Sequence, residues 1–294
     1  MTTQDLHRVG IVVHPRREID RALGRVQAWA SERGAGVVQI PMAGIDRVVA
    51  DPGTAGSCDV VLALGGDGTT LAALHAAGPE HKPVLGVACG SLGALTATSG
   101  DELDDALRMF SAGEWMPRSL PGIAVTSDGH PPAVALNDFV VVRKGASQIA
   151  VAIEVDGELF VRFAGDGIVI ATPLGSSAYT MAAGGPVLAP RTDSIVLTPL
   201  APHGGSCPPL VVGRDSVLAV TIEPGYYGAR VDLDGHVEEL QPPTLSIRWL
   251  PDYATLVTFA GAETLLAGLR RRRIVADSPR VLARDDRAAA ITRR

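Results

Sequence analysis

Residues 60–70 read Val-Val-Leu-Ala-Leu-Gly-Gly-Asp-Gly-Thr-Thr, so a short apolar run ends in two glycines and an aspartate. The apolar run is typical of a buried strand, and the glycines let the backbone approach a ligand closely. We expect Thr69 or Thr70 to cap a helix that begins near Leu71. The N–H groups at a helix start favour phosphate, whereas the charge of Asp67 opposes it. We therefore interpret Asp67 as a group aimed at a hydroxyl, or at a magnesium ion carried by phosphates, and the stretch predicts phosphoryl transfer.

The composition predicts a protein of about two domains with a core of aliphatic side chains. The chain has 294 residues, of which 46% are hydrophobic and only 4% aromatic. Its formal net charge of −6 argues against nucleic acid as a primary partner. The three cysteines are far apart, no leader-like segment opens the chain, and no apolar run approaches the roughly 20 residues that span a bilayer. We expect a cytoplasmic protein with no membrane partner.

The pattern of elements changes near residue 118. Upstream, apolar strand patterns alternate with helical patterns, which predicts a Rossmann-like α/β domain with a parallel sheet. Downstream, many short strands separated by turn residues, among them 133–143, 245–249 and 255–259, predict an all-β domain of two layers. We expect the α/β domain to span 1–117 and the β-rich domain 118–261, with the tail 262–294 packing back on the first. In a parallel sheet, ligands bind beyond the carboxyl ends of the strands, where the glycine-aspartate turn lies.

Five Asp-Gly pairs occur in the chain, and their contexts differ. Those at Asp128 and Asp156 predict tight hairpin turns, and the pair at Asp234 would be interpreted in the same way. Asp67 instead joins a strand to a helix. Asp166 opens a run of small residues that continues to Pro186, in which Gly175-Ser-Ser177 predicts a turn that caps a helix beginning at Ala178. Small residues can admit a flat ring or a sugar to the backbone, or they can serve tight packing, and composition leaves both interpretations open.

Several motifs, in this order and at this spacing, resemble the NAD kinase family. Besides the glycine-aspartate turn they are Asn137-Asp138, the segments 166–179 and 183–186, Gly90-Ser-Leu-Gly93, the segment 198–203 and Asp234-Gly235. The resemblance covers roughly residues 8–275. Diacylglycerol, sphingosine and phosphofructo-kinases carry turns similar to Gly-Gly-Asp-Gly-Thr, so the long motif after Asp166 makes the resemblance specific.

The resemblance implies an enzyme that transfers the γ-phosphoryl group of ATP, or of polyphosphate, to the adenosine 2′-hydroxyl of NAD. It also implies a requirement for Mg²⁺ and a homodimer or homotetramer. Asp67 would accept the proton of the hydroxyl, and the β-rich domain would bind the dinucleotide. The residues expected to bind the nucleotides are Gly65, Gly66, Gly68, Thr69, Asn137, Asp138, Asp166, Ser177, Ala178, Tyr179, Ala182 and Asp234. The seven histidines show no metal-ligand spacing, so no metal-binding side chains are assigned.

The chain departs from the family pattern around the expected acceptor pocket. Ala88 and Ala94 stand where the family usually has an asparagine and a phenylalanine, and Leu174 and Ala182 stand where small hydroxyl residues are usual. Asp138 is one methylene shorter than the common glutamate. Two alternatives therefore stay open. The chain is a diverged kinase of the same fold that phosphorylates another alcohol, such as a nucleoside, sugar or lipid, or it is a non-catalytic dinucleotide-binding protein.

Overall fold

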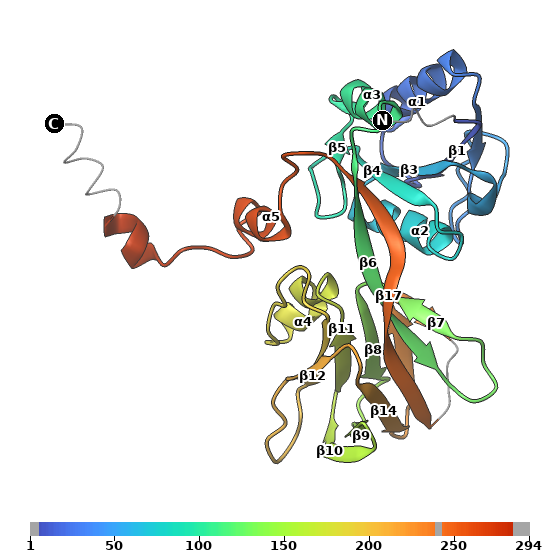
Figure 1. The fold of residues 1–294 in the computed structure, drawn as a ribbon. Coiled ribbons are helices and arrows are strands. Elements are labelled where there is room, and N and C mark those ends of the chain that lie inside the picture. Colours follow the sequence, from blue (N-terminus) through green and yellow to red (C-terminus); the bar gives the residue numbers. More distant parts are fainter. Residues whose placement is uncertain (1–5, 239–242, 285–294) are drawn as a thin grey trace. The chain divides into compact units, whose positions relative to one another are not determined.

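The computed structural model describes residues 6–238 and 243–284 (Figure 1). The chain divides into two compact units, one that ends at Phe259 and one that begins at Ala260. The second unit contains α5 (Leu265–Arg271), whose first turn is capped by the hydroxyl of Thr264. The predicted packing of the tail 262–294 on the first domain stays a prediction, and residues 285–294 lie outside the described part. No described helix has the length and apolarity that crossing a membrane requires.

The amino-terminal part is the predicted α/β layer structure. Its parallel strands are adjacent in the order β4 (Pro83–Ala88), β3 (Val60–Gly65), β1 (Arg8–Val13) and β2 (Gly36–Gln39). Alternate residues of β1 and β3 enter two different apolar clusters. One cluster includes α1 (Asp20–Glu32) and α3 (Leu103–Ser111), and the other includes α2 (Asp67–Ala77). Helices therefore cover both faces of the sheet, as predicted.

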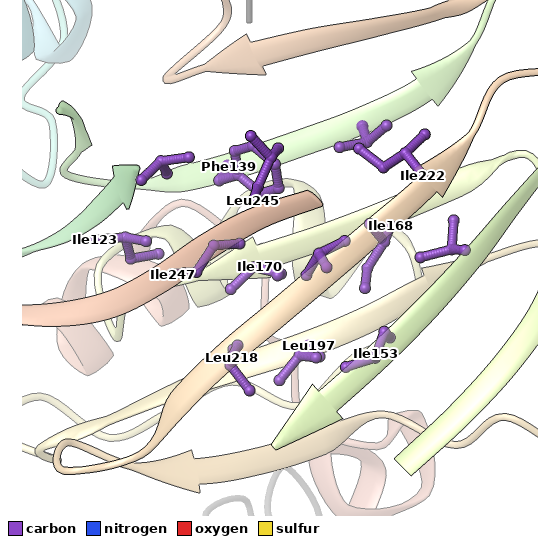
Figure 2. Packing of buried hydrophobic residues seen from close by; sticks show 14 of the residues in the cluster. Ile123, Phe139, Ile153, Ile168, Ile170, Leu197, Leu218, Ile222, Leu245 and Ile247 are labelled. Atoms are coloured by element: carbon purple, nitrogen blue, oxygen red, sulfur yellow. The ribbon is translucent and has the colours of Figure 1, made fainter. Parts of the chain in front are cut away.

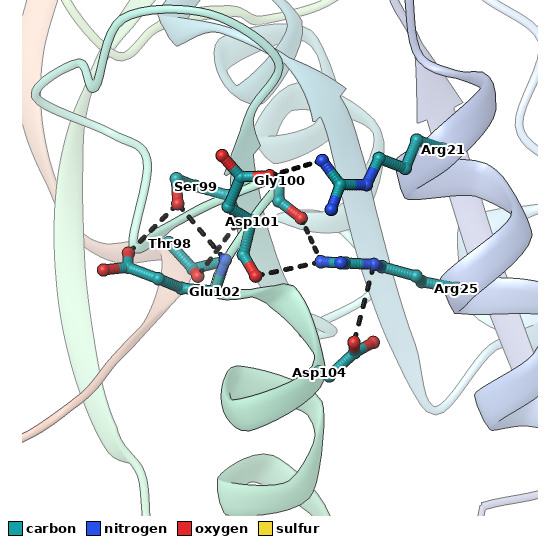
Figure 3. Close-up of polar contacts among 8 residues, drawn as sticks. All are labelled: Arg21, Arg25, Thr98, Ser99, Gly100, Asp101, Glu102 and Asp104. Atoms are coloured by element: carbon teal, nitrogen blue, oxygen red, sulfur yellow. Dashed lines mark hydrogen bonds and ion pairs between the residues drawn. The ribbon is translucent and has the colours of Figure 1, made fainter.

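Polar contacts join α1 to the start of α3 (Figure 3). Arg25 donates through Nη1 to the carbonyl oxygens of Gly100 and Asp101, at 2.5 and 2.9 Å. Arg21 pairs with the carboxylate of Asp101 at 2.7 Å. Gly100 follows the short strand β5 (Thr98–Ser99), which pairs with β4. The contacts thus hold one helical layer in register with the sheet edge, although exposed ion pairs of this kind each contribute little stability.

Two long strands carry the sheet onward from the α/β part. β17 (Thr244–Thr258) pairs in parallel with β4 at one end and antiparallel with β14 (Val217–Glu223) at the other. β6 (Met116–Thr126) runs along β17 (Figure 1). The sequence predicted two strands over residues 245–259, which is wrong. A register shift between Leu250 and Ala254, with Asp252 at φ 49°, bends the chain without ending the strand.

The carboxyl-terminal part has two facing layers. The first sheet continues through β14, β9 (Ile149–Val155) and β10 (Glu158–Gly165). The strands of the second sheet, in order, are β13 (Leu210–Gly213), β12 (Ser194–Leu200), β11 (Gly167–Ala171), β8 (Asp138–Arg143), β15 (Ala229–Leu233) and β16 (His236–Glu238). Inward side chains of both sheets form one core, in which Ile168 and Phe139 face Leu245 and Ile222 (Figure 2). The antiparallel two-layer prediction is confirmed.

One predicted strand, over residues 133–143, is divided in the structure. Residues Ala133–Ala135 form β7, which pairs with β6 in the first sheet, while β8 belongs to the second. The chain changes layers at Leu136 and Asn137. Their N–H groups do not enter a strand ladder, because the carboxylate of Asp234 accepts them. An alternating apolar pattern looks the same whether or not the strand changes sheets, so sequence periodicity does not detect this break.

Candidate active site

The glycine-aspartate turn joins β3 to α2 at the carboxyl edge of the parallel sheet. The helix begins at Asp67, with Gly66 as its N-cap and no side-chain cap. The prediction that Thr69 or Thr70 caps a helix near Leu71 is wrong, because the buried hydroxyl of Thr70 donates back to the carbonyl oxygen of Gly66 at 3.0 Å. Asp67 therefore lies in the first turn of α2, which begins four residues earlier than expected.

Backbone groups from the loop after the neighbouring strand β4 fix the carboxylate of Asp67. Its two oxygens accept the N–H of Ala94 at 2.9 Å and the N–H of Leu95 at 2.8 Å. These residues belong to the loop after β4, so this loop and the turn after the adjacent strand β3 meet at the carboxylate. A Cβ at Gly93 would overlap the carboxylate group, so a side chain at this position would displace the carboxylate of Asp67. Because its hydrogen bonds come from the backbone, the direction of Asp67 is set by the fold.

The three glycines of the turn differ in their surroundings. Gly65 is buried, and a Cβ there would overlap the hydroxyl of Thr69. A Cβ on Gly66 would come within 3.0 Å of the guanidinium of Arg17. Gly68, in contrast, is exposed, and a Cβ there would have no atom within 4 Å. Packing thus explains Gly65. A side chain at position 66 would only have to displace the end of Arg17, and the protein itself does not require a glycine at position 68.

A cationic group that the sequence reasoning missed lies beside the turn. The Nη1 atom of Arg17 is 3.4 Å from the carbonyl oxygen of Gly65. Arg17 follows β1, and its N–H donates to Nδ1 of His14 at 3.0 Å. Burial and the charges of Arg17, Arg47 and Arg16 lower the pKa of His14. Within the described part of the chain, no carboxylate lies at ion-pair distance from Arg17. The pattern His-Pro-Arg-Arg directly after the first strand was the signal that could have identified this group.

Asp234 lies in a two-residue turn between β15 and β16, so its hairpin interpretation is confirmed. Its side chain is nevertheless fully buried. The carboxylate accepts the N–H groups of Leu136, Asn137 and Asp138 at 2.7, 2.6 and 3.0 Å. It also lies 2.6 Å from Nε2 of His75. Asp234 thereby fixes the corner at which the chain passes from β7 to β8.

Asp138 is buried next to Asp234. Burial, together with the carboxylates of Asp234 and Asp232, raises the pKa of Asp138 to about 7. The neighbouring Asn137 is half-buried, and its carbonyl oxygen accepts the N–H of Thr172 at 2.9 Å. The structure therefore brings the predicted Asn137-Asp138 pair against the start of the small-residue run.

An open pocket of about 500 Å³ contains two of the predicted residues, Asp166 and Tyr179. The side chains and backbone that complete its lining belong to Val142, Arg143, Ala183, Leu200 and Ala201. Arg143, which sequence reasoning missed, donates through Nε to the Asp166 carboxylate at 2.5 Å. Tyr179 is 42% exposed, so part of the residue is open to solvent.

Tight packing explains several small residues of the run after Asp166. A Cβ at Gly175 would overlap the backbone of Asn137, and one at Gly185 would overlap the hydroxyl of Thr198. Ser177 is half-buried, and its hydroxyl donates to the carbonyl oxygen of Leu174 at 3.1 Å. Ala178 and Ala182 are exposed on either side of Tyr179. The predicted helix start at Ala178 is a 3₁₀ turn over Gly175–Ser177, followed by the four-residue helix α4 (Tyr179–Ala182).

Leu174, one of the unusual residues, is partly buried against the apolar cluster that includes Leu136 and does not line this pocket. Ala88 is buried in β4, where it pairs with Gly65. Ala94 is half-buried and contributes its N–H to Asp67. In the described residues no group of three or more His, Cys, Asp or Glu is arranged to hold a metal ion.

The predicted residues therefore form three groups. Asp67 belongs to the turn beyond β3, Asn137 and Asp138 to the corner held by Asp234, and Asp166 and Tyr179 to the pocket. The helix α2 links the first two groups, since it begins at Asp67 and carries His75. Thr172 and Gly175 link the corner to the small-residue run.

The sequence matches two family models. One, described as the ATP-NAD kinase N-terminal domain, matches residues 45–115, and the other, described as the ATP-NAD kinase C-terminal domain, matches residues 136–250. The chain is 31% identical over 279 residues to the NAD kinase of Chloroflexus aurantiacus, covering 90% of this chain and 99% of that one. It is 34% identical over 243 residues to the NAD kinase of Chlorobium phaeobacteroides, covering 80% and 85%.

Solved structures show the same fold. A yeast NADH kinase complexed with NADH superimposes with a TM-score of 0.78 at 21% identity, covering 93% of this chain and 89% of that one. An NAD kinase from Archaeoglobus fulgidus in complex with ATP gives a TM-score of 0.73 at 24% identity, covering 92% and 100%. At these identities the likeness is one of fold, while the curated relatives establish the lineage. The chain belongs to the NAD kinase family.

Proposed function

We propose that this protein transfers the γ-phosphoryl group of ATP to the adenosine 2′-hydroxyl of NAD, forming NADP. The observation that carries this proposal is the carboxylate of Asp67, which is held by the N–H groups of Ala94 and Leu95 from the loop after β4. The bond between the hydroxyl oxygen and the γ-phosphorus forms, and the bond from that phosphorus to the β–γ bridging oxygen breaks. ADP leaves, and the hydroxyl proton passes to Asp67.

The fixed direction of Asp67 suits this reaction. Phosphoryl transfer usually has a loose transition state, so positioning and charge neutralisation contribute more than early proton removal. A carboxylate that is already oriented by backbone donors needs no rearrangement when the hydroxyl arrives. Asp67 is proposed to orient the hydroxyl and to accept its proton late in the transfer.

The phosphoryl donor is proposed to bind at the turn itself. The N–H groups that open α2 and the guanidinium of Arg17 both favour anionic oxygens. The exposed Gly68 leaves space for a ligand at the same place. Gly65 and Thr69 shape the turn by packing, and Gly66 is the N-cap of α2.

The residues at the turn fit a magnesium ion that arrives with the donor. Mg²⁺ commonly takes one or two carboxylates together with phosphate oxygens and water. Asp67 is the carboxylate at this turn, and the described residues form no larger cluster of metal-binding side chains. Bound there, the ion would neutralise charge on the phosphates.

The acceptor is proposed to bind between the corner and the pocket. Asn137 and Asp138 offer polar groups, and the pKa of about 7 lets the Asp138 carboxyl carry a proton over part of the neutral range. The pocket of about 500 Å³ is of the size that small ligands use. Tyr179 presents a ring on which adenine can stack, and Asp166 presents oxygens to ribose hydroxyls. The neighbouring Ser177, Ala178 and Ala182 are small enough to let the ring approach.

The phosphoryl donor and the acceptor can be tested in one assay panel. Purified protein is incubated with Mg²⁺, with ATP or polyphosphate as donor, and with NAD, NADH, a nucleoside, a sugar or a diacylglycerol as acceptor. NADP formed from ATP and NAD is the expected result. Phosphorylation of another alcohol in preference to NAD would replace this proposal with the diverged-kinase alternative. Dinucleotide binding with no consumption of any donor would indicate a non-catalytic binding protein.

Asp67→Asn is expected to lower NADP formation by at least about 100-fold, since it keeps the shape but removes the proton acceptor. The matched control is Asp128→Asn, which changes an exposed aspartate of another Asp-Gly turn. Equal activity of the two variants would contradict the role of Asp67. A homodimer or homotetramer and a cytoplasmic location are also proposed, to be checked by light scattering and by fractionation of cells.

A further inference from the structure

One side chain of α2 outside the turn contacts the opposite part of the site. His75 follows Asp67 by about two helical turns in the same helix. Its Nε2 atom lies 2.6 Å from the carboxylate of Asp234, which comes from the turn between β15 and β16. The contact therefore joins two elements that are 159 residues apart in sequence.

Asp234 also contacts the corner before β8. Three consecutive N–H groups, those of residues 136–138, end on its buried carboxylate. They are not in a strand ladder there, because the chain is changing from one sheet to the other. A single carboxylate thus accepts from α2 on one side and from the Asn137-Asp138 corner on the other.

The position of the His75 ring is restricted by its neighbours. The ring of Tyr253, from β17, meets it edge-on at a centroid distance of 6.5 Å and an angle of 62°. The His75 side chain is 27% exposed and the Asp234 side chain is not exposed at all. The titratable groups gathered here are His75, Asp234, Asp138 and Tyr253, and burial together with Asp234 raises the pKa of the tyrosine. The imidazole is thus packed as well as hydrogen-bonded.

We propose that His75 is a positioning residue for phosphoryl transfer. Through Asp234 it sets the Asn137-Asp138 corner relative to the helix that begins at Asp67. The inference rests on the proposed function, in which Asp67 faces the hydroxyl and the corner holds the acceptor. A displacement of about 1 Å between reacting groups can cost 100-fold in rate. The hydrogen bond between His75 and Asp234 therefore affects catalysis by fixing α2 relative to the corner, although His75 itself does not contact the substrate.

The test compares His75→Leu with His75→Gln, which keeps an N–H donor, and with His130→Leu at an exposed turn. We expect His75→Leu to lower kcat for NADP formation by about 10- to 100-fold with a smaller change in KM for ATP. His75→Gln should recover most of the lost kcat, and His130→Leu should match the wild type. A kcat for His75→Leu within twofold of the wild type, or equal losses in both His75 variants, would overturn the proposal.

A second measurement does not depend on activity. Amide hydrogen exchange of residues 136–138 should become at least about 10-fold faster in His75→Leu, because their common acceptor loses its tie to α2. Exchange within β1 should stay unchanged, which shows that the fold is intact. Unchanged exchange at 136–138 would overturn the positioning role even if the wild type makes no NADP. Failure of the wild type to make NADP, with faster exchange in the variant, would count against the proposed function alone.

Discussion

Gly93 lies directly against the carboxylate of Asp67, so close that a Cβ on the glycine would overlap both carboxylate oxygens. Asp67 opens the helix that follows β3, and Gly93 lies in the loop after the adjacent parallel strand β4. We predict that Gly93→Ala displaces the carboxylate from the N–H groups of Ala94 and Leu95. NADP formation should fall about 100-fold, and the free energy of unfolding should fall by about 1–3 kcal/mol. Steady-state kinetics and urea unfolding measure the two effects.

Gly68→Ala is the matched comparison for this variant. A Cβ at position 68 would have no protein atom within 4 Å, so the free energy of unfolding should stay the same or rise slightly. Any loss of activity in Gly68→Ala would then come from contact between the added methyl group and a ligand bound at the turn. Equal destabilisation of the two variants would contradict the packing described for Gly93.

Asp138 should make stability depend on pH. Its pKa is raised from 3.8 to about 7 in the folded protein, so folding takes up a proton between these values. The contribution of protonated Asp138 to stability is fully present below the pKa of the unfolded chain. It is lost as the pH rises through the pKa of the folded protein. The free energy of unfolding should therefore decrease from pH 4 to pH 7, by up to about 1.4 kcal/mol per pH unit from this group.

The isosteric variant Asp138→Asn removes this titration. Urea unfolding at several pH values should show a flatter dependence between pH 4 and 7 for the variant than for the wild type. Asp128→Asn, which changes an exposed carboxylate, should keep the wild-type slope. A wild-type slope in Asp138→Asn would show that Asp138 is not the group that titrates.

Arg17 should affect the phosphoryl donor and not the acceptor. Its guanidinium lies next to the carbonyl oxygen of Gly65, at the place proposed for the phosphates. Because a hydrogen bond to a charged group contributes about 1.5–3 kcal/mol, Arg17→Ala should raise KM for ATP by about 10- to 100-fold. KM for NAD should change little. Arg21→Ala, in the exposed pair with Asp101, is the control, and a larger change in KM for NAD than for ATP would contradict the assignment.

Much of the fold was predictable from local patterns. The α/β elements followed apolar runs and helical periodicities, and the hairpin at Asp156 followed the Asp-Gly pair, with φ of 53° at the aspartate. The single long strand β17 was not predictable, because a bend at Asp252 has the same local signal as a turn between two strands. The division of residues 133–143 between two sheets was missed for a similar reason, since it depends on partners far away in sequence.

For the site, the sequence by itself determined which residues we propose for the chemistry, because the glycine-aspartate turn and the motif after Asp166 are continuous stretches of chain. Only the tertiary structure decided what holds them. The N–H groups that orient Asp67 belong to residues 94 and 95, and the carboxylate that fixes Asn137 and Asp138 comes from a hairpin almost 100 residues later. Any residue can supply a backbone N–H donor, so such donors have no signal in the sequence. An Asp-Gly turn with a buried carboxylate has the same sequence as one with an exposed carboxylate. Such contacts are set by the approach of distant strands, which appears only when the sheets are assembled.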